Sequence, residues 1–277
     1  MNYRHIFHAG NFADVHKHVI LLALIDRLIR KPKPLLLLDT HAGRGTYDLR
    51  SAEATRGDEA QGGVRRVINA STVSNPDLKR FVDLLTPALR KQHYLGSPLL
   101  AAQALRAEDR LICVESQLEE AQELQNVLRE RRNTSVIHGD GYAALKTYLP
   151  PKEARGLVLL DPPYESDREF NTITHALLAA TKRWATGVYA IWYPIKASGE
   201  SRRFKEELRH LGIKKILQLE LFVHPRDSRV GLNGSGMAIV NSPWKLDEEM
   251  RAAQAELYGL LADRAADEPV AEWLVGE

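Results

Sequence analysis

Short apolar runs that alternate with longer segments of helical periodicity constrain this chain more than any other feature of its sequence. A short apolar run bounded by proline or glycine is typical of a strand buried on both faces of a parallel sheet. Helical segments between such strands are typical of crossover connections, which cover both faces of the sheet. The runs occupy 35–39, 111–115, 135–138, 157–161, 188–193, 216–222 and 237–240, and the helical patterns occupy 116–132, 141–149, 168–184 and 201–211. The sequence therefore predicts an α/β fold with a mostly parallel seven-stranded sheet.

One long segment departs from this alternation. Residues 46–96 separate the first two strands and are far too many for an ordinary crossover. Within them, the Asn-Pro-Asp triplet at 75–77 is a strong helix start, because it combines an N-cap residue, a proline at the first helical position and an acid in the first turn. We therefore expect 46–96 to form a small helical insertion subdomain, and 1–45 together with 97–277 to form the main domain.

The two ends of the chain give further expectations. Asn11 precedes an apolar helical stripe, which predicts an N-capped helix that runs to about Arg30 before prolines stop it. The last two strands are joined by a polar, glycine-rich link over 224–236, so we expect them to pair antiparallel at one edge of the sheet. The acidic segment 247–277 is interpreted as the solvated face of a helix.

Composition excludes several classes of protein. With 277 residues, 44% of them hydrophobic, the chain suits one large domain with an insertion. The N-terminus lacks the apolar centre of a signal peptide and no apolar run is long enough to span a membrane, so we expect a cytoplasmic protein. The single cysteine, Cys113, excludes an internal disulfide and a cysteine-rich metal site. His16 and His18 point to different faces of the predicted helix, and no metal is expected.

Charge is unevenly distributed along the chain. The net charge is only +2, yet 1–33, 44–96 and 202–230 are rich in lysine and arginine. Basic residues that gather on one face form a surface for a polyanion such as nucleic acid. The sequence therefore favours a nucleic-acid partner.

The ends of three predicted strands suggest an adenosyl-binding site. A glycine-rich loop that includes Gly43 follows the first strand, and such a loop lets a ligand approach bare backbone. Glu115 ends the second strand, where an acid in nucleotide-binding folds accepts hydrogen bonds from both ribose hydroxyls. Asp140 and Gly141 follow the third strand, where the carboxylate can accept from an adenine amino group. Ligands of doubly wound sheets bind at this carboxyl edge.

The most specific motif is Asp-Pro-Pro-Tyr at 161–164, after the fourth strand. It resembles the catalytic loop of amino-group methyltransferases, in which a carboxylate and a backbone carbonyl hold the two hydrogens of an aromatic amine. Asp161 and the carbonyl of Pro162 would then activate a weakly nucleophilic amine, and Tyr164 would stack on a base removed from its helix. This resemblance implies an S-adenosylmethionine-dependent methyltransferase of class I, with a Rossmann-like fold, that acts on a base amino group.

The chain also resembles, over nearly its whole length, the RlmJ family of 23S ribosomal RNA adenine-N6 methyltransferases. The shared motifs are Tyr3-Arg4-His5, His8-Ala9-Gly10-Asn11, Ala13-Asp14, Lys17-His18, Asp39-Thr40-His41-Ala42-Gly43, Gly96-Ser97-Pro98, Asp140-Gly141, Asp161-Pro162-Pro163-Tyr164, Trp192-Tyr193-Pro194 and Pro243-Trp244-Lys245. Arg44 stands where a smaller residue is typical of the family, and 46–96 matches poorly.

The resemblance implies roles for individual residues. S-adenosylmethionine would be bound by Lys17, His18, His41, Gly43, Ser97, Glu115, Asp140, Gly141 and Asp161. Asp161 would be the catalytic acceptor, and Tyr3, Arg4 and Tyr164 would contact the RNA. The substrate would be an adenine in 23S ribosomal RNA that is protein-free or partly assembled, and the protein would act as a monomer.

The residues alone do not choose between RNA and DNA, or between adenine and cytosine. A DNA adenine-N6 methyltransferase is therefore an alternative, although such enzymes normally have a larger target-recognition domain than 46–96. A non-catalytic RNA-binding assembly factor with a relict fold is a second alternative, and the intact motif at 161–164 argues against it.

Overall fold

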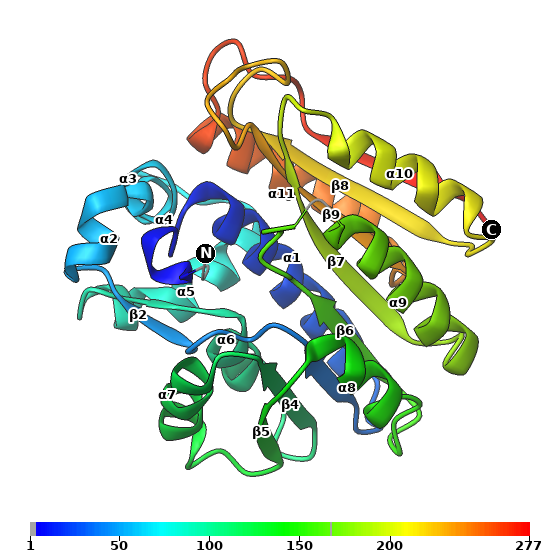
Figure 1. Cartoon of the computed structure of the whole chain (residues 1–277). Helices are drawn as coiled ribbons and strands as arrows, with labels where there is room; N and C mark the ends of the chain where they lie inside the picture. The colour runs from blue at the N-terminus through cyan, green and yellow to red at the C-terminus, as the bar shows by residue number, and fades with distance from the viewer. Residues whose placement is uncertain (1–3, 167) are drawn as a thin grey trace.

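The computed structural model describes residues 4–166 and 168–277. Its strands are β1 (Leu36–Asp39), β2 (Thr46–Asp48), β3 (His93–Leu95), β4 (Arg110–Glu115), β5 (Thr134–His138), β6 (Gly156–Leu160), β7 (Val188–Ile195), β8 (Ile216–Phe222), β9 (Gly234–Val240) and β10 (Val270–Val275). Eight of them form one sheet in the order β10-β8-β9-β7-β6-β1-β4-β5, which runs through the middle of the molecule (Figure 1). The neighbouring strands β5, β4, β1, β6 and β7 are parallel to one another. β9 pairs antiparallel with both β7 and β8, and β8 pairs antiparallel with β10. The predicted α/β fold with a mainly parallel sheet is confirmed.

Each of the seven predicted runs forms a strand of this sheet, but the strand number was wrong by one. The additional strand, β10, pairs antiparallel with β8 and forms the edge. It lies in the acidic segment interpreted as a helix face, and it is partly exposed, so its apolar signal is weak. The expected antiparallel pair is present as β8 and β9, but both strands lie inside the sheet rather than at its edge.

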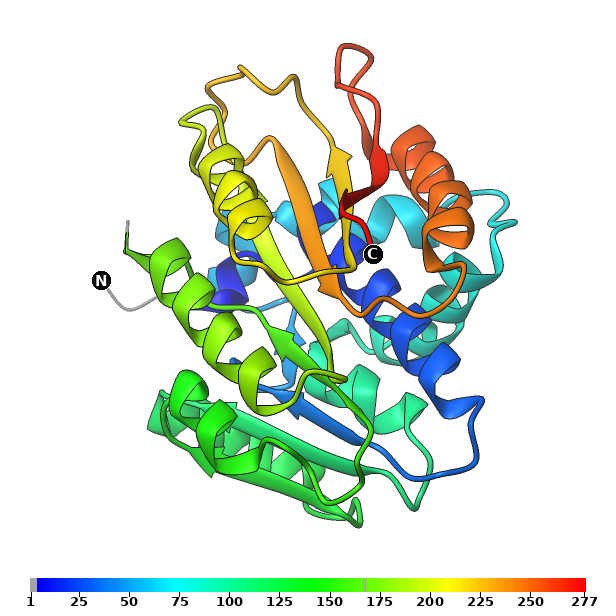
Figure 2. The same ribbon diagram turned by 90° about the vertical axis from the view of Figure 1, so that its right-hand side faces the viewer.

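Helices cover both faces of the sheet (Figure 2). They are α1 (Phe12–Ile29), α2 (Ala52–Gly57), α3 (Glu59–Gly62), α4 (Val64–Ile68), α5 (Pro76–Leu89), α6 (Ser97–Ala104), α7 (Leu118–Leu128), α8 (Gly141–Tyr148), α9 (Glu169–Arg183), α10 (Glu200–His210) and α11 (Leu246–Leu261), preceded by the 3-10 turn η1 (His5–Phe7). Side chains of α1, α6, α7 and α11 pack in one core cluster, and those of α8, α9 and α10 pack in another on the opposite face. Within the described residues, no helix is both long enough and apolar enough to cross a membrane.

Helix α1 is almost completely buried, unlike an ordinary surface helix. The side chain of Asn11 caps it and accepts a hydrogen bond from the backbone amide of Asp14 at 2.9 Å. The helix packs against the sheet on one side and against α5, α6 and α11 on others. Polar side chains on its first turns are therefore enclosed by protein, and they must find partners there.

Residues 46–96 begin and end with a two-stranded sheet, in which β2 pairs antiparallel with β3. Between these strands lie α2 to α5, and the side chain of Asn75 caps α5 by accepting from the amides of Asp77 and Leu78. The strand pair was not anticipated, because each strand has only three residues, too few for a period of two to be recognised in the sequence.

The topology places the ends of β1 and β6 side by side. β1 lies between β4 and β6, so the chain leaves β1 in one direction across the sheet and later returns in the other. In the register, Asp39 of β1 lies opposite Leu159 of β6 and Cys113 of β4. Such a switch point opens a crevice at the carboxyl ends of the strands, where ligands bind.

Candidate active site

A cavity of about 700 Å³ opens at this switch point. Its walls come from the loops after β1, β4, β6, β7 and β8, from α1 and from residues 46–96. The volume lies in the range of sites that enclose a cofactor-sized ligand. Nine of the predicted site residues line it together: Lys17, His18, His41, Gly43, Ser97, Glu115, Asp161, Pro162 and Tyr164.

The remaining predicted site residues lie elsewhere. Asp140 is exposed, and its Oδ1 caps α8 by accepting from the amides of Tyr142 and Ala143; it lines a second cavity of about 370 Å³. Gly141 packs so closely on the end of β1 that a Cβ would stand 2.1 Å from the carbonyl oxygen of Thr40. Arg4 forms an ion pair with Glu53 of α2 at 3.4 Å and is absent from the lining. Tyr3 lies outside the described residues.

The glycine loop and Glu115 are joined by backbone hydrogen bonds. The amide of Gly43 donates to Oε2 of Glu115 and the amide of Gln117 donates to Oε1, each at 2.8 Å. Gly43 has a φ of 62°, and a Cβ there would meet the hydroxyl of Tyr47 at 2.3 Å, so this position requires glycine. The Glu115 carboxylate is thus fixed at the cavity wall, with lone pairs left for a ligand.

Asp39 is a buried carboxyl directly behind this wall. The hydroxyl of Ser97 donates to its Oδ2 at 2.6 Å, and the amide of His41 donates to its Oδ1 at 3.3 Å. Burial, together with the nearby negative charge of Asp161, raises the pKa of Asp39 to about 7. Burial also lowers the pKa of His41 to about 4, so its imidazole is neutral at physiological pH.

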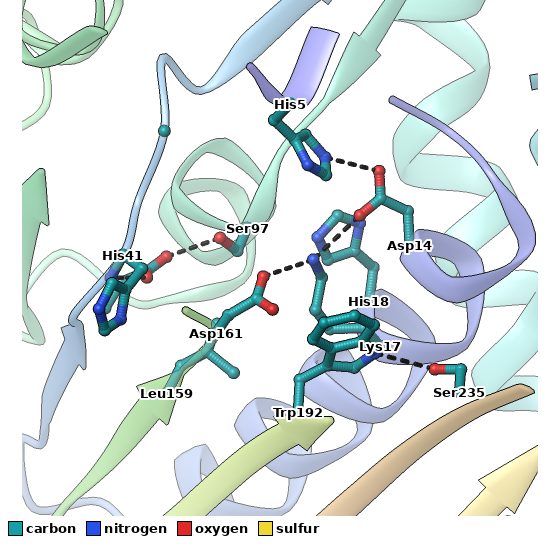
Figure 3. A network of polar contacts seen from close by, with 12 residues as sticks. His5, Asp14, Lys17, His18, His41, Ser97, Leu159, Asp161, Trp192 and Ser235 are labelled. Carbon is teal, nitrogen blue, oxygen red and sulfur yellow. Dashed lines mark hydrogen bonds and ion pairs between the residues drawn. The ribbon is translucent and has the colours of Figure 1, made fainter. Parts of the chain in front are cut away.

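A chain of charged side chains leads to Asp161 (Figure 3). The ammonium of Lys17 lies 2.5 Å from Oδ2 of Asp161 and 2.9 Å from Oδ1 of Asp14. The imidazole of His5 lies 2.9 Å from Oδ2 of Asp14. Lys17 and Asp14 are 6% and 2% exposed, so water screens this chain of charges only weakly.

The charges in this chain stabilise one another against burial. Burial alone would lower the pKa of Lys17, but Asp14 and Asp161 outweigh it and raise the pKa well above its ordinary value. Burial alone would raise the pKa of Asp14, but His5 and Lys17 hold it well below its ordinary value. Lys17 is therefore a permanent cation beside Asp161.

Sequence reasoning gave no role to Asp14 or to Trp192. Asp14 and Lys17 are three positions apart, a spacing that places two side chains on one helix face, and this signal was available. No local pattern pairs Lys17 with Asp161, which lies 144 positions away. Trp192 lines the cavity from β7, with the Lys17 ammonium 5.6 Å from the centroid of its ring.

Tyr164 lies at a turn in the loop that follows β6. Its φ of 52° lies in the left-handed region, which is uncommon for a residue with a side chain. Its ring packs against Phe170, at 4.8 Å between centroids, and edge-on against Trp192, at 5.6 Å. Burial raises the pKa of Tyr164 well above its ordinary value, and the protonated hydroxyl donates to the backbone carbonyl of Trp192.

Arg44, the departure noted in the glycine loop, forms a two-point ion pair with Glu120 of α7, at 2.8 and 2.5 Å. Its side chain is thus held against α7, beside Glu120, and Glu120 lines the cavity. Over residues 4–166 and 168–277, no three His, Cys, Asp or Glu side chains are grouped as metal ligands.

Comparisons with known proteins agree on one family. The model of the family described as "Ribosomal RNA large subunit methyltransferase D, RlmJ" matches residues 32–275. Two proteins named Ribosomal RNA large subunit methyltransferase J match over the whole of both chains: that of Haemophilus influenzae is 36% identical over 281 residues, and that of Escherichia coli K12 is 37% identical over 280. The crystal structure of protein LPL1258 from Legionella pneumophila has a TM-score of 0.89 and 31% identity, over 96% of this chain and 98% of that one. The chain therefore belongs to the RlmJ family of ribosomal RNA large subunit methyltransferases.

Proposed function

We propose that this protein transfers a methyl group from S-adenosylmethionine to the N6 amino group of an adenine in 23S ribosomal RNA. Membership of the family makes it an S-adenosylmethionine-dependent methyltransferase. One observation carries the choice of an amino group: the Asp161 carboxylate lies in the same cavity as Glu115 and the glycine loop. An amine-activating loop and a nucleoside-binding wall therefore face one space.

The residues at the end of β1 and β4 fit the donor. When bound, S-adenosylmethionine supplies an electrophilic methyl group. The fixed carboxylate of Glu115 suits two adjacent ribose hydroxyls, and the Gly43 loop exposes backbone to the cavity. His18, His41 and Ser97 line the same space and complete the proposed donor contacts.

Asp140 and Gly141 keep their proposed role at the adenine ring of the donor. Oδ1 of Asp140 is used as a helix cap, and the exposed carboxylate lies two residues after the end of β5, the strand next to β4. The close packing of Gly141 on Thr40 holds this loop beside the glycine loop. This part of the site rests on position alone, because the two residues line no wall of the main cavity.

Asp161 and the carbonyl of Pro162 would accept the two hydrogens of the target amine. Because Oδ2 of Asp161 faces the Lys17 ammonium, Oδ1 is the oxygen available to the amine. The Lys17 ammonium lies 2.5 Å from Oδ2 and holds the carboxylate in place, and a hydrogen bond to a carboxylate is about twice as strong as one between neutral groups. These contacts favour the rehybridised nitrogen, whose lone pair can then attack. Tyr164, which lines the cavity, would stack on the extruded base.

The RNA would lie across the mouth of this cavity. The basic segments 1–33, 44–96 and 202–230 would contact phosphates, and Tyr3 and Arg4 would contact RNA near the target base. In this proposal, 46–96 is an insertion subdomain beside a methyltransferase domain of 1–45 and 97–277. The protein acts as a cytoplasmic monomer on 23S RNA that is protein-free or partly assembled.

A tritiated-methyl assay tests this proposal. Purified 23S RNA, assembled large subunits and adenine-containing duplex DNA are compared as substrates, and the labelled nucleoside is identified by mass spectrometry. We expect N6-methyladenosine in protein-free 23S RNA, with little label in the other two. Efficient labelling of the DNA would favour a DNA adenine methyltransferase. Absence of label together with absent calorimetric binding of S-adenosylmethionine would favour a non-catalytic assembly factor.

A further inference from the structure

Trp192 contacts both Lys17, in the row of charged side chains, and Tyr164, in the loop after β6. Its ring lies under the Lys17 ammonium, and its backbone carbonyl accepts the Tyr164 hydroxyl. Its indole nitrogen points the other way, toward β9, and donates to the hydroxyl of Ser235 at 2.9 Å (Figure 3). Ser235 is completely buried and pairs with Pro194 in the register of β7 and β9. The indole is therefore tied to the sheet core at its polar end.

Two further buried side chains fix the hydroxyl of Ser235. His16 of α1 lies with Nδ1 2.9 Å from the Ser235 oxygen and with Nε2 3.2 Å from the amide nitrogen of Gln254. That amide nitrogen also donates to the carbonyl of Glu220 at 2.9 Å, so it is a donor toward His16. Nε2 of His16 is then the acceptor, and the ring proton is on Nδ1.

The protonation state of His16 supports this assignment. Burial lowers the pKa of His16 to about 3, so the imidazole is neutral and has one donor and one acceptor. Its Nδ1–H donates to Ser235, which thus accepts from His16 and from Trp192 at once. The hydroxyl cannot rotate away without leaving a buried donor unsatisfied, which costs more than the bond itself contributes.

We propose that Ser235 is a positioning residue for methyl transfer, which acts by anchoring the indole of Trp192 beneath Lys17 and beside Tyr164. This inference rests on the proposed function, because it assigns Ser235 to the target-base side of that site. The anchor matters because the χ2 torsion, which rotates the ring of an aromatic side chain, has a broad distribution. Packing or a hydrogen bond must therefore select one ring orientation. The ring orientation then sets the wall against which Lys17 and Tyr164 rest.

The test uses the full-length protein with protein-free 23S RNA from cells that lack it. For Ser235→Ala we expect kcat to fall about tenfold, the scale of one lost hydrogen bond to a buried donor. The KM for RNA and the Kd for S-adenosylmethionine should stay within about twofold, because neither the glycine loop nor the basic surface changes. The matched control is Tyr193→Phe, which removes a buried hydroxyl that donates to Glu220 and lies on the opposite face of β7 from Trp192. The control should keep wild-type kcat.

A double-mutant cycle isolates the route through the indole. Trp192→Phe keeps an aromatic ring but removes the donor, and it supplies the measurement if Ser235→Ala folds poorly. We expect Trp192→Phe to lower kcat, and the double variant to be no slower than Trp192→Phe alone. Wild-type kcat in Ser235→Ala, an equal loss in Tyr193→Phe, or additive losses in the cycle would overturn the inference. Failure of the wild-type protein to methylate this RNA would instead refute the proposed function.

Discussion

The two halves of the cavity are built in different ways. The donor half, defined as His41, Gly43, Ser97 and Glu115, lies on strand ends and helix starts, and backbone amides hold its central carboxylate. The acceptor half is defined as Asp14, Lys17, Asp161, Tyr164 and Trp192. Its residues come from α1, from β7 and from the loop after β6. Its members are held by ion pairs, by ring contacts, by the hydrogen bond of Tyr164 to a backbone carbonyl and by that of Trp192 to Ser235.

This difference predicts in which half the geometry of the site depends on individual side chains. A carboxylate bound by backbone amides keeps its orientation as long as the strands are in place. A buried ion chain keeps its orientation only while every charge is present, because removal of one leaves another unpaired. We therefore expect substitutions in the acceptor half to affect stability and rate together, and substitutions in the donor half to affect S-adenosylmethionine binding.

Lys17→Met should have the largest effect. It removes the cation between Asp14 and Asp161, and loss of one partner of a buried pair costs about 3–5 kcal/mol. Urea unfolding at pH 7 measures this loss, and single-turnover methyl transfer should fall in the same variant. A change in the free energy of unfolding below about 1 kcal/mol would contradict the buried-ion-chain account.

Lys205→Met is the matched control for that variant. It breaks another largely buried ion pair, with Glu220 at 2.7 Å, away from the cavity. We expect it to lower the free energy of unfolding while single-turnover methyl transfer, measured below its unfolding transition, stays at the wild-type rate. An equal loss of rate in both variants would mean that Lys17 contributes only stability.

Asp161→Asn should lower single-turnover methyl transfer by about 100-fold or more, the scale of losing a charge-stabilising group. One carbonyl acceptor remains, but its hydrogen bond to the amine is neutral and weaker. Lys17 loses one of its two carboxylate partners but keeps Asp14, so the loss of stability should be smaller than in Lys17→Met. A rate within a few-fold of wild type at saturating donor would remove Asp161 from the chemistry.

Glu115→Ala should weaken S-adenosylmethionine binding by about 1.5–3 kcal/mol, the range for hydrogen bonds to a charged acceptor. The amides of Gly43 and Gln117 also lose their acceptor in this variant. Calorimetry measures the Kd, and Glu119→Ala, an exposed carboxylate on the nearby helix α7, is the control. An unchanged Kd for Glu115→Ala would exclude Glu115 from the donor half.

Asp39→Asn should change the pH dependence of stability. The pKa of Asp39 is raised to about 7 in the folded protein, so the folded state binds a proton more tightly than the unfolded state does. The stability that this proton contributes is complete below about pH 4 and is lost as pH rises to about 7. In that window, the difference in unfolding free energy between wild type and variant should change by at most about 1.4 kcal/mol per pH unit. Parallel stability profiles would show that Asp39 titrates normally.

The same two halves differ in how far sequence predicted them. Gly43 and Glu115 were predicted to face one ligand because strand ends in a parallel sheet meet at one edge, which depends only on strand order. The ion pair of Lys17 with Asp161 depends on how α1 packs across the sheet, and local periodicity contains no such information. The resemblance placed Lys17 at the donor, whereas its described contacts are the carboxylates of Asp14 and Asp161.

The other correct and missed sequence predictions have similar physical causes. The cap at Asn11 was predicted correctly because it is encoded by adjacent residues. The strand β10 was missed because a half-exposed edge strand contains charged residues such as Glu272 and is stabilised by pairing with β8 rather than by its own apolar character. Trp192 and Ser235 were missed as partners because they are joined only through the pairing of β7 with β9.

The most direct test of the division between the halves is one rate, measured in two variants at saturating S-adenosylmethionine. Glu115→Ala and Asp161→Asn are each mixed with protein-free 23S RNA, and single-turnover formation of N6-methyladenosine is followed by mass spectrometry. We predict that Glu115→Ala recovers to within about threefold of wild type once the donor saturates it, because its loss is one of binding. Asp161→Asn should remain about 100-fold slower at every donor concentration, because its loss is in the transition state. Recovery of the rate in Asp161→Asn at high donor concentration would contradict the division. A rate in Glu115→Ala that stays low at saturating donor would also contradict it.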